Sequence, residues 1–382
     1  MTDLHGLLAG YVADGALPGA VALLAHGDRV EVTAVGSADL AGTAPMARDS
    51  IFRIASLTKP ITAAALLMLV EDGVLGLYDP IGPWLPELAE PVVVRAPTSP
   101  IEDVVPANRP ITVYDLLTST AGWGFASDFG LPAVQRLVPV QRDGREVQSF
   151  PDLDTWLAEL AEVPLVHQPG AGWLYDTCSA LQGALIARAA GGSLPDFLAE
   201  RLCAPLGMTD TAFEVPADRR DRFTSLYKAD PEGDLRLADP PDGQWSTRPA
   251  FPLGSGGLAG TVDDWLAFAR MLLAGGTAAD GRRLLSTESV RLMTTDHTSP
   301  AQREMGRLFL RGQGWGMGGS VDIARTDEWN VPGRYGWVGG TGTSAYLVPA
   351  AGTVAILFTQ VGVDSPAPLD WLHDFWRYAA RA

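Results

Sequence analysis

A serine and a lysine three positions apart, Ser56 and Lys59, are the residues of this sequence best placed to do chemistry. They follow the β-rich segment 51–55 and precede the apolar run 61–70, which predicts a short strand turning into a buried helix. In a first helical turn, side chains three apart share a face and can meet. The free N–H groups and positive dipole at such a helix start favour a developing oxyanion near Ser56.

Composition singles out Lys59. The chain has 28 lysine and arginine residues, of which only Lys59 and Lys228 are lysines. Arginine does not release its proton at working pH, whereas a buried lysine can. A lysine one turn from a serine therefore suggests a group that exchanges protons with a nucleophile. Taken alone, the Ser-x-x-Lys pattern also fits a capping serine and a solvated lysine.

Two further segments contain residues that could complete a site. Tyr175 lies just before a predicted helix, where a phenol can act as a base. The glycine-rich segment 335–343 includes Gly339 and Gly340, which allow close approach of a ligand and leave N–H groups free to point at an oxyanion. Each segment also has a plain structural interpretation, a packing tyrosine and an ordinary turn.

Length and composition limit the classes of function. With 382 residues, 47% of them apolar and 19% charged, the chain can build a substantial core in one or two domains. Its formal net charge of −17 argues against nucleic acid and anionic membrane surfaces as partners. Cys178 and Cys203 are too few for a disulfide framework or a zinc site, and we expect both to be buried.

Several other functions are disfavoured by the motifs present. The N-terminus is typical of an amphipathic helix rather than a signal peptide, and no run approaches a membrane span, so we expect a cytoplasmic protein. The histidines show no metal spacing, and we expect neither a metal nor an organic cofactor. The segment 314–319 spells Gly-x-Gly-x-x-Gly without a following crossover helix, and no Gly-x-Ser-x-Gly elbow of an α/β-hydrolase occurs.

The elements that must position these residues follow from periodicity. Segments 19–26 and 29–36 predict a hairpin, 78–110 a wrapping loop, and the runs from Thr112, 152–162, 177–190 and 194–202 helices. Strands return at 314–324, 336–338, 344–348 and 353–360, before a closing helix at 369–380. We therefore predict an α+β protein with an α/β sandwich domain, its antiparallel sheet built from 1–78 and 212–382, and an inserted, mainly helical domain at 79–211.

Together, the three segments resemble the serine β-lactamase and penicillin-binding protein superfamily, and most closely its class C β-lactamases and family VIII carboxylesterases. The resemblance extends over nearly the whole chain. Beyond the Ser-x-x-Lys motif it includes the segments 111–122, 205–211 and 254–261. It implies a β-lactamase/transpeptidase-like fold.

The resemblance also implies roles for individual residues. Ser56 would be the nucleophile, Lys59 its activating partner, and Tyr175 the tyrosine of the family's Tyr-x-Asn element. The backbone N–H groups of Ser56 and Gly340 would form the oxyanion hole. Thr177 stands where the family has asparagine, and Trp337-Val338-Gly339 stands where lactamases have Lys-Thr-Gly, similar to the Trp-Gly-Gly of the esterase branch.

These departures predict the kind of substrate. Replacement of the strand lysine by Trp337 and of the asparagine by Thr177 removes a cation and an amide donor. We expect Gly339, Thr177 and the apolar surface of Trp337 to bind the substrate, with further lining from Trp123, Phe125, Trp173 and Trp315. Such a lining suits uncharged acyl chains better than a carboxylate-bearing lactam.

The sequence thus predicts a cytoplasmic serine hydrolase that cleaves carboxylic esters through an acyl-enzyme on Ser56, acting on a small-molecule ester or amide. Three alternatives stay open: a β-lactamase, D-amino peptidase or amidase; an acyltransferase; and a binding or sensor module that is acylated once and stalls. The sequence does not decide whether Lys59 or Tyr175 is the principal base. It also does not distinguish a monomer from a homo-oligomer.

Overall fold

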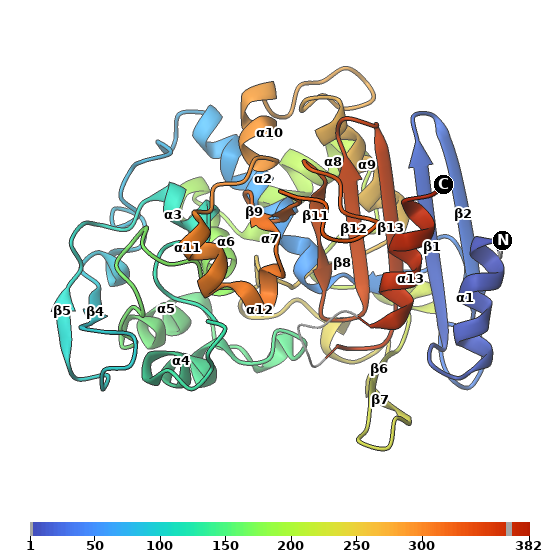
Figure 1. Ribbon diagram of the computed structural model, residues 1–382, viewed down its shortest axis with the longest axis horizontal. Coiled ribbons are helices and arrows are strands. Elements are labelled where there is room, and N and C mark those ends of the chain that lie inside the picture. Colours follow the sequence, from blue (N-terminus) through green and yellow to red (C-terminus); the bar gives the residue numbers. More distant parts are fainter. Residues whose placement is uncertain (1–2, 364–368) are drawn as a thin grey trace.

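A seven-stranded antiparallel sheet organises the computed structural model, which describes residues 3–363 and 369–382 (Figure 1). Its strand order is β2-β1-β13-β12-β11-β10-β9. The bounds are β1 Gly19–His26, β2 Arg29–Gly36, β9 Gly314–Trp315, β10 Ser320–Val321, β11 Tyr335–Gly339, β12 Thr343–Val348 and β13 Thr353–Thr359. The N-terminal hairpin joins the C-terminal strands because β1 pairs with β13, with Ala20 opposite Thr359. Both ends of the chain therefore build one sheet.

Helices cover both faces of this sheet. Helices α1 (Leu4–Ala13) and α13 (Asp370–Ala379) contact each other on one face, and α9 (Val262–Leu273) packs on the other. Strand β1 shows why, since its residues alternate between two cores: Val21 and Leu23 face the large core, while Ala20 and Ala22 face the smaller core beneath α1 and α13. A strand buried on both sides has a continuous apolar sequence rather than an alternating one.

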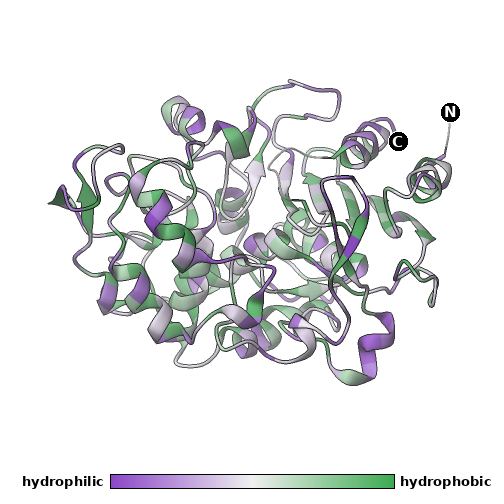
Figure 2. Ribbon diagram, turned by 90° about the horizontal axis from the view of Figure 1, so that it is seen from below, coloured by the Kyte–Doolittle hydropathy of each residue, from purple (hydrophilic) through white to green (hydrophobic). Residues whose placement is uncertain are grey.

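The rest of the large core is built around α2 (Thr58–Glu71), which packs against α6 (Thr177–Ala190). Every residue of α2 from Thr58 to Leu69 is buried, so the helix has no solvent face to mark it as amphipathic. In Figure 2 the inner elements are mainly green and the peripheral helices carry purple faces. The remaining helices are α3 Val113–Leu117, α4 Pro132–Gln141, α5 Leu153–Ala161, α7 Leu194–Leu198, α8 Ala204–Leu206, α10 Thr287–Met293, α11 Pro300–Met305 and α12 Arg307–Leu310.

Most predicted elements are confirmed with small shifts of their ends. The hairpin has the predicted bounds, Thr112 caps α3 in a capping box, and α6 spans the predicted residues. Cys178 and Cys203 are buried free thiols, as expected. The segment 78–110 differs, because it contains a small hairpin of β4 (Val92–Val94) and β5 (Val104–Pro106). The division into a sheet domain and an inserted domain stays a prediction.

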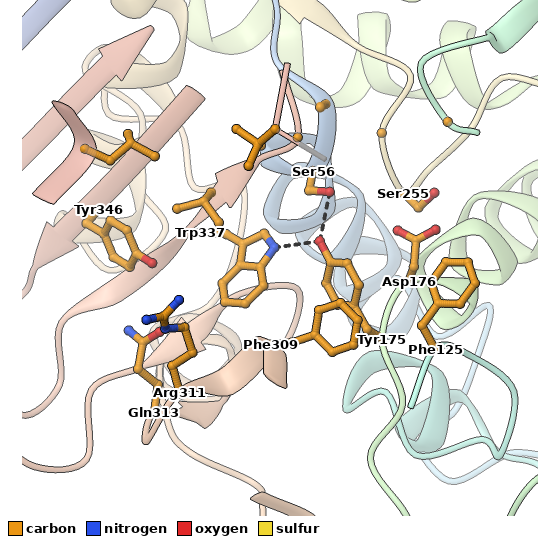
Figure 3. Close-up of a pocket in the computed structure, with 18 of the residues that line it drawn as sticks. Ser56, Phe125, Tyr175, Asp176, Ser255, Phe309, Arg311, Gln313, Trp337 and Tyr346 are labelled. Atoms are coloured by element: carbon orange, nitrogen blue, oxygen red, sulfur yellow. Dashed lines mark hydrogen bonds between the residues drawn. The ribbon is translucent and has the colours of Figure 1, made fainter. Parts of the chain in front are cut away.

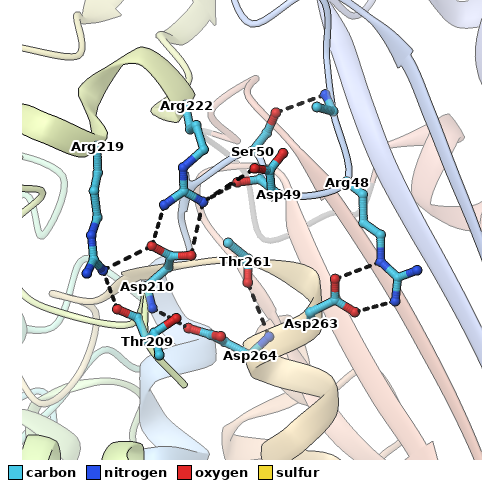
Figure 4. A network of polar contacts seen from close by, with 11 residues as sticks. Arg48, Asp49, Ser50, Thr209, Asp210, Arg219, Arg222, Thr261, Asp263 and Asp264 are labelled. Atoms are coloured by element: carbon cyan, nitrogen blue, oxygen red, sulfur yellow. Dashed lines mark hydrogen bonds and ion pairs between the residues drawn. The ribbon is translucent and has the colours of Figure 1, made fainter. Parts of the chain in front are cut away.

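A polar network fastens the segment 205–211 to the start of α9 (Figure 4). The Asp264 carboxylate accepts hydrogen bonds from the Asp210 N–H at 2.9 Å and the Thr211 hydroxyl at 2.8 Å. Asp210 in turn forms ion pairs with Arg222 at 2.6 Å and Arg219 at 3.1 Å. Two two-stranded sheets complete this region: β8 (Ala259–Gly260) paired with β3 (Phe52–Arg53), and the β6–β7 hairpin (Leu226–Ala229, Leu235–Asp239). Among the described residues, no helix combines the length and apolarity needed to cross a bilayer.

Candidate active site

Ser56 lies in a tight turn between β3 and α2. A 3₁₀ turn, Ala55–Leu57, connects the two elements, and Ala55 adopts the left-handed region with φ 44°. The buried hydroxyls of Thr341 and Thr343 donate to the carbonyls of Arg53 and Ile54 just before the turn. The glycine- and threonine-rich loop that ends β11 therefore holds the backbone that presents Ser56.

The Ser56 hydroxyl is the meeting point of the predicted catalytic residues. Its Oγ accepts a hydrogen bond from Lys59 Nζ at 2.8 Å and one from the Tyr175 hydroxyl at 2.9 Å. Figure 3 shows the Tyr175 hydroxyl directed at Ser56 and the Trp337 indole nitrogen directed at the Tyr175 hydroxyl. The structure thus brings Ser56, Lys59 and Tyr175 into direct contact, although Tyr175 is far from the other two in the chain.

Lys59 is the most deeply enclosed charge of the site, with a side chain 1% exposed. Its Nζ contacts Asp176 Oδ1 at 2.6 Å and donates to the Ser255 carbonyl at 2.7 Å. Burial by itself lowers the pKa of this lysine, but attraction by Asp176 and Tyr175 outweighs burial and raises the pKa above its ordinary value. The contact with Asp176 therefore favours the ammonium form of Lys59.

Tyr175 is held in place from three sides. Its backbone exchanges two 2.9 Å hydrogen bonds with Phe125, and its ring stacks on Phe309 at a centroid distance of 4.7 Å. The indole Nε1–H of Trp337 donates to its phenolic oxygen at 2.8 Å. The phenolic oxygen therefore lies between an indole donor and the nucleophile.

Gly339 and Gly340 lie beside Ser56 at the end of β11 and line the same cleft. A Cβ atom at Gly339 would be 2.6 Å from the Ile54 carbonyl oxygen and 2.1 Å from Thr343 Oγ1, so only glycine lets the strand approach this closely. A Cβ atom at Gly340 would meet nothing within 4 Å. The predicted oxyanion-hole residue thus faces open space.

The cleft in front of Ser56 has a volume of about 500 Å³. One wall is aromatic, made by Phe125, Phe129 and Phe309 together with Tyr175. The cleft is less apolar than the sequence predicts, because arginines also line it. They are Arg142, Arg145, Arg311 and Arg334.

Four of the predicted substrate-binding residues do not line this cleft. Trp123 is 2% exposed and donates its indole N–H to the Val163 carbonyl, so it belongs to the core. Trp315 is 1% exposed and packs behind Trp337, edge to face at 4.9 Å. Thr177 is fully buried and donates to Gln141 Oε1 at 2.8 Å. Trp173, which was also expected there, is likewise buried, whereas Phe125, Trp337 and Gly339 do line the cleft.

Asp176 and Phe309 are among the residues of the site that the sequence prediction does not include. Asp176 binds Lys59 directly, and Phe309 forms part of the aromatic wall. The family's Tyr-x-Asn element assigns a role to position 177 but none to the residue before it, Asp176. Phe309 belongs to a short helix, α12, that carries no recognisable motif.

Comparison with known proteins identifies the family of the chain. The model of the β-lactamase family matches residues 4–375. Protein Rv1367c of Mycobacterium tuberculosis is 38% identical over 357 residues, which cover 91% of this chain and 86% of that protein. Esterase EstB of Burkholderia gladioli is 31% identical over 370 residues, covering 91% and 87%.

Among solved structures, the chain is similar to EstCE1, described as a hydrolase with promiscuous acyltransferase activity. The TM-score is 0.81 at 24% identity, over 98% of this chain and 96% of that one. The predicted β-lactamase/transpeptidase-like α+β architecture is therefore confirmed.

Proposed function

Because the chain belongs to the β-lactamase family, we propose that it is a serine hydrolase that cleaves carboxylic esters through an acyl-enzyme on Ser56. One observation carries the proposal. The Ser56 Oγ atom is hydrogen-bonded to both Lys59 and Tyr175, and it opens into a cleft lined by Trp337, which the family resemblance aligns with the strand lysine of lactamases. The similarity to a protein named as an esterase supports the choice of reaction.

In the proposed acylation step, Tyr175 takes the Ser56 proton and later passes it to the leaving alcohol. In the reactive form Tyr175 is a phenolate, stabilised by the Lys59 ammonium and the Trp337 N–H. It accepts the Ser56 proton across their 2.9 Å contact while Oγ attacks the ester carbonyl carbon. The N–H groups of Ser56 and Gly340 bind the oxyanion, an interaction whose loss usually costs about 10²–10³ in rate. When the tetrahedral intermediate collapses, the C–O bond to the alcohol breaks and Tyr175 gives its proton to the departing oxygen.

Deacylation reverses the same proton path. A water molecule takes the place of the alcohol, gives a proton to Tyr175 and attacks the acyl carbon. Collapse of the second tetrahedral intermediate breaks the bond to Ser56 Oγ, which recovers the proton from Tyr175. The carboxylic acid leaves, and the site returns to its starting state.

Ester preference rests on the strand position of Trp337. An indole N–H is a neutral donor and already serves Tyr175, so it offers no cation to a lactam carboxylate. The aromatic wall next to it can take up an apolar acyl chain.

The test compares wild type and Ser56→Ala on p-nitrophenyl acetate and butyrate, with nitrocefin as the lactam probe. We expect steady ester turnover and an acyl adduct on wild type by intact-mass spectrometry, slow nitrocefin hydrolysis, and neither turnover nor adduct in the variant at unchanged thermal melting. Residual turnover in Ser56→Ala beyond a trace would refute the nucleophile. Fast nitrocefin cleavage would instead favour a β-lactamase, and product diverted to an added alcohol would favour an acyltransferase.

A stable adduct without turnover would show a module that is acylated once. That outcome would keep Ser56 as the nucleophile and refute the hydrolase.

A further inference from the structure

Asp176 has a backbone conformation that residues other than glycine rarely adopt. Its φ and ψ are 84° and −62°, and the Thr177 N–H donates across it to the Tyr175 carbonyl at 3.2 Å. This is a γ-turn of the strained hand, which costs an L-residue energy that glycine would avoid. The turn directs the Tyr175 side chain to Ser56 and the Asp176 side chain to Lys59.

Both oxygens of the Asp176 carboxylate are engaged. Oδ1 contacts Lys59 Nζ at 2.6 Å, and Oδ2 accepts a hydrogen bond from Gln141 Nε2 at 2.7 Å. Gln141 is itself 2% exposed, and its Oε1 accepts from the Thr177 hydroxyl at 2.8 Å. A chain of buried contacts thus runs from the last residue of α4 through Asp176 to the lysine.

This arrangement leaves Asp176 poorly suited to activating water, although it lines the cleft and its side chain is 19% exposed. A general base needs a free lone pair directed at the proton it takes. Here one oxygen faces an ammonium group and the other an amide donor, so neither oxygen is directed at a water molecule. Its effect must therefore reach the reaction through Lys59.

We propose that Asp176, oriented by Gln141, is a positioning residue that keeps Lys59 in its ammonium form and so leaves Tyr175 as the base that deprotonates Ser56. The inference rests on the proposed function and deepens it. Asp176 and Tyr175 are the ionisable groups that face Lys59, the first at 2.6 Å and the second with its ring centroid at 4.7 Å from Nζ. The other two contacts of Nζ, the Ser255 carbonyl and Ser56, carry no charge.

The shape of the site allows a substitution that removes only the charge. In Asp176→Asn the new amide keeps an oxygen toward Lys59 if the Gln141 amide turns over, because the Thr177 hydroxyl can accept a hydrogen bond as well as donate one. Without the carboxylate, burial dominates, and the pKa of Lys59 falls. The ammonium is then lost at a lower pH than in the wild type.

The experiment measures kcat/KM for p-nitrophenyl butyrate against pH. For Asp176→Asn we expect a loss of at least about tenfold at neutral pH and a basic limb moved to lower pH by at least about one unit. Gln141→Leu should move the same limb in the same direction by less. Asp280→Asn, which removes an exposed carboxylate paired with Arg282, should leave the wild-type profile.

Two outcomes would overturn the inference. If Lys59 worked as the neutral base, removing the carboxylate would raise the fraction of free amine, and Asp176→Asn would be faster than the wild type at neutral pH. If Asp176→Asn lowers kcat/KM by the same factor at every pH and the basic limb does not move, Asp176 contributes only packing. Either result would leave the ester hydrolase intact if Ser56→Ala is inactive, whereas an active Ser56→Ala would refute the proposed function first.

Discussion

The Trp337 indole and the Tyr175 phenol share a 2.8 Å hydrogen bond in which the indole is the donor. Strand β11 therefore supports the phenolic oxygen with a neutral group. The only cation in contact with Ser56 among the described residues is Lys59, which the Asp176 carboxylate neutralises. The charge in contact with Ser56 is thus balanced before a substrate enters.

Trp337→Phe tests this hydrogen bond. The substitution keeps an aromatic ring on β11 and removes the N–H donor. A hydrogen bond to a charged group is worth about 1.5–3 kcal/mol, so we expect kcat/KM for p-nitrophenyl butyrate to fall about 10–100-fold.

Trp315→Phe is the matched comparison for that loss. Trp315 is a buried neighbour of Trp337, and its indole nitrogen has no hydrogen-bond partner among the described residues. The same change of ring at this position should therefore reduce kcat/KM by much less. Equal losses in the two variants would indicate that ring volume, rather than the donor, sustains the activity.

Gly339→Ala should damage the site through contact alone. Its Cβ would be 2.1 Å from Thr343 Oγ1 and 2.6 Å from the Ile54 carbonyl oxygen, so β11 must move away from the turn that bears Ser56. Overpacking of this kind typically costs about 1–3 kcal/mol, and we expect a lower melting temperature together with loss of esterase activity. Gly340→Ala, with no atom within 4 Å of its Cβ, should melt like the wild type. An unaltered melting temperature in Gly339→Ala would contradict the close approach.

Asp264→Asn should stabilise the protein, and by more as pH rises. Burial raises the pKa of Asp264 to about 6, and repulsion from Asp210 and Asp263 adds to this despite the hydrogen bonds it accepts. The folded state therefore binds a proton that the unfolded state releases, and wild-type stability falls between about pH 4 and pH 6. Asparagine lacks this penalty and can accept the same hydrogen bonds.

Urea unfolding at a series of pH values measures the effect. The stability of Asp264→Asn relative to the wild type should grow by up to about 3 kcal/mol from the lower to the upper end of this pH range. Asp28→Asn, which removes an exposed carboxylate in the β1–β2 turn, serves as the control for net charge. A difference that stays constant with pH would show that Asp264 is ionised in the folded protein throughout.

The parts of the site that the sequence predicts are those with local causes. Ser56 and Lys59 meet because a helical turn places residues three apart on one face, and Thr112 caps α3 through its own neighbours. Tyr175 is a candidate from its position before a helix, but only the family resemblance places Tyr175 and Trp337 next to Ser56, because no local rule does so.

What could not be predicted depends on packing between distant segments. From the sequence, Trp123, Trp315 and Trp337 are all expected to line the cleft. Contacts across the core decide that, of these three, only Trp337 does so. The contact of Asp176 with Lys59 needs the γ-turn, because an extended or helical backbone at that position would direct the carboxylate elsewhere.

The strand order has a consequence for synthesis on the ribosome. Strand β13 lies between β1, made among the first residues, and β12, so the hairpin β1–β2 has no partner until nearly the whole chain has been translated. Until then β1 and β12 each present an unpaired apolar edge, a template for pairing with other nascent chains. Gly340 also cannot be held beside Ser56 before β11 exists. The sheet and the candidate site are therefore completed late in synthesis. Premature termination shortly before β13 would yield an aggregation-prone product rather than a weakly active one.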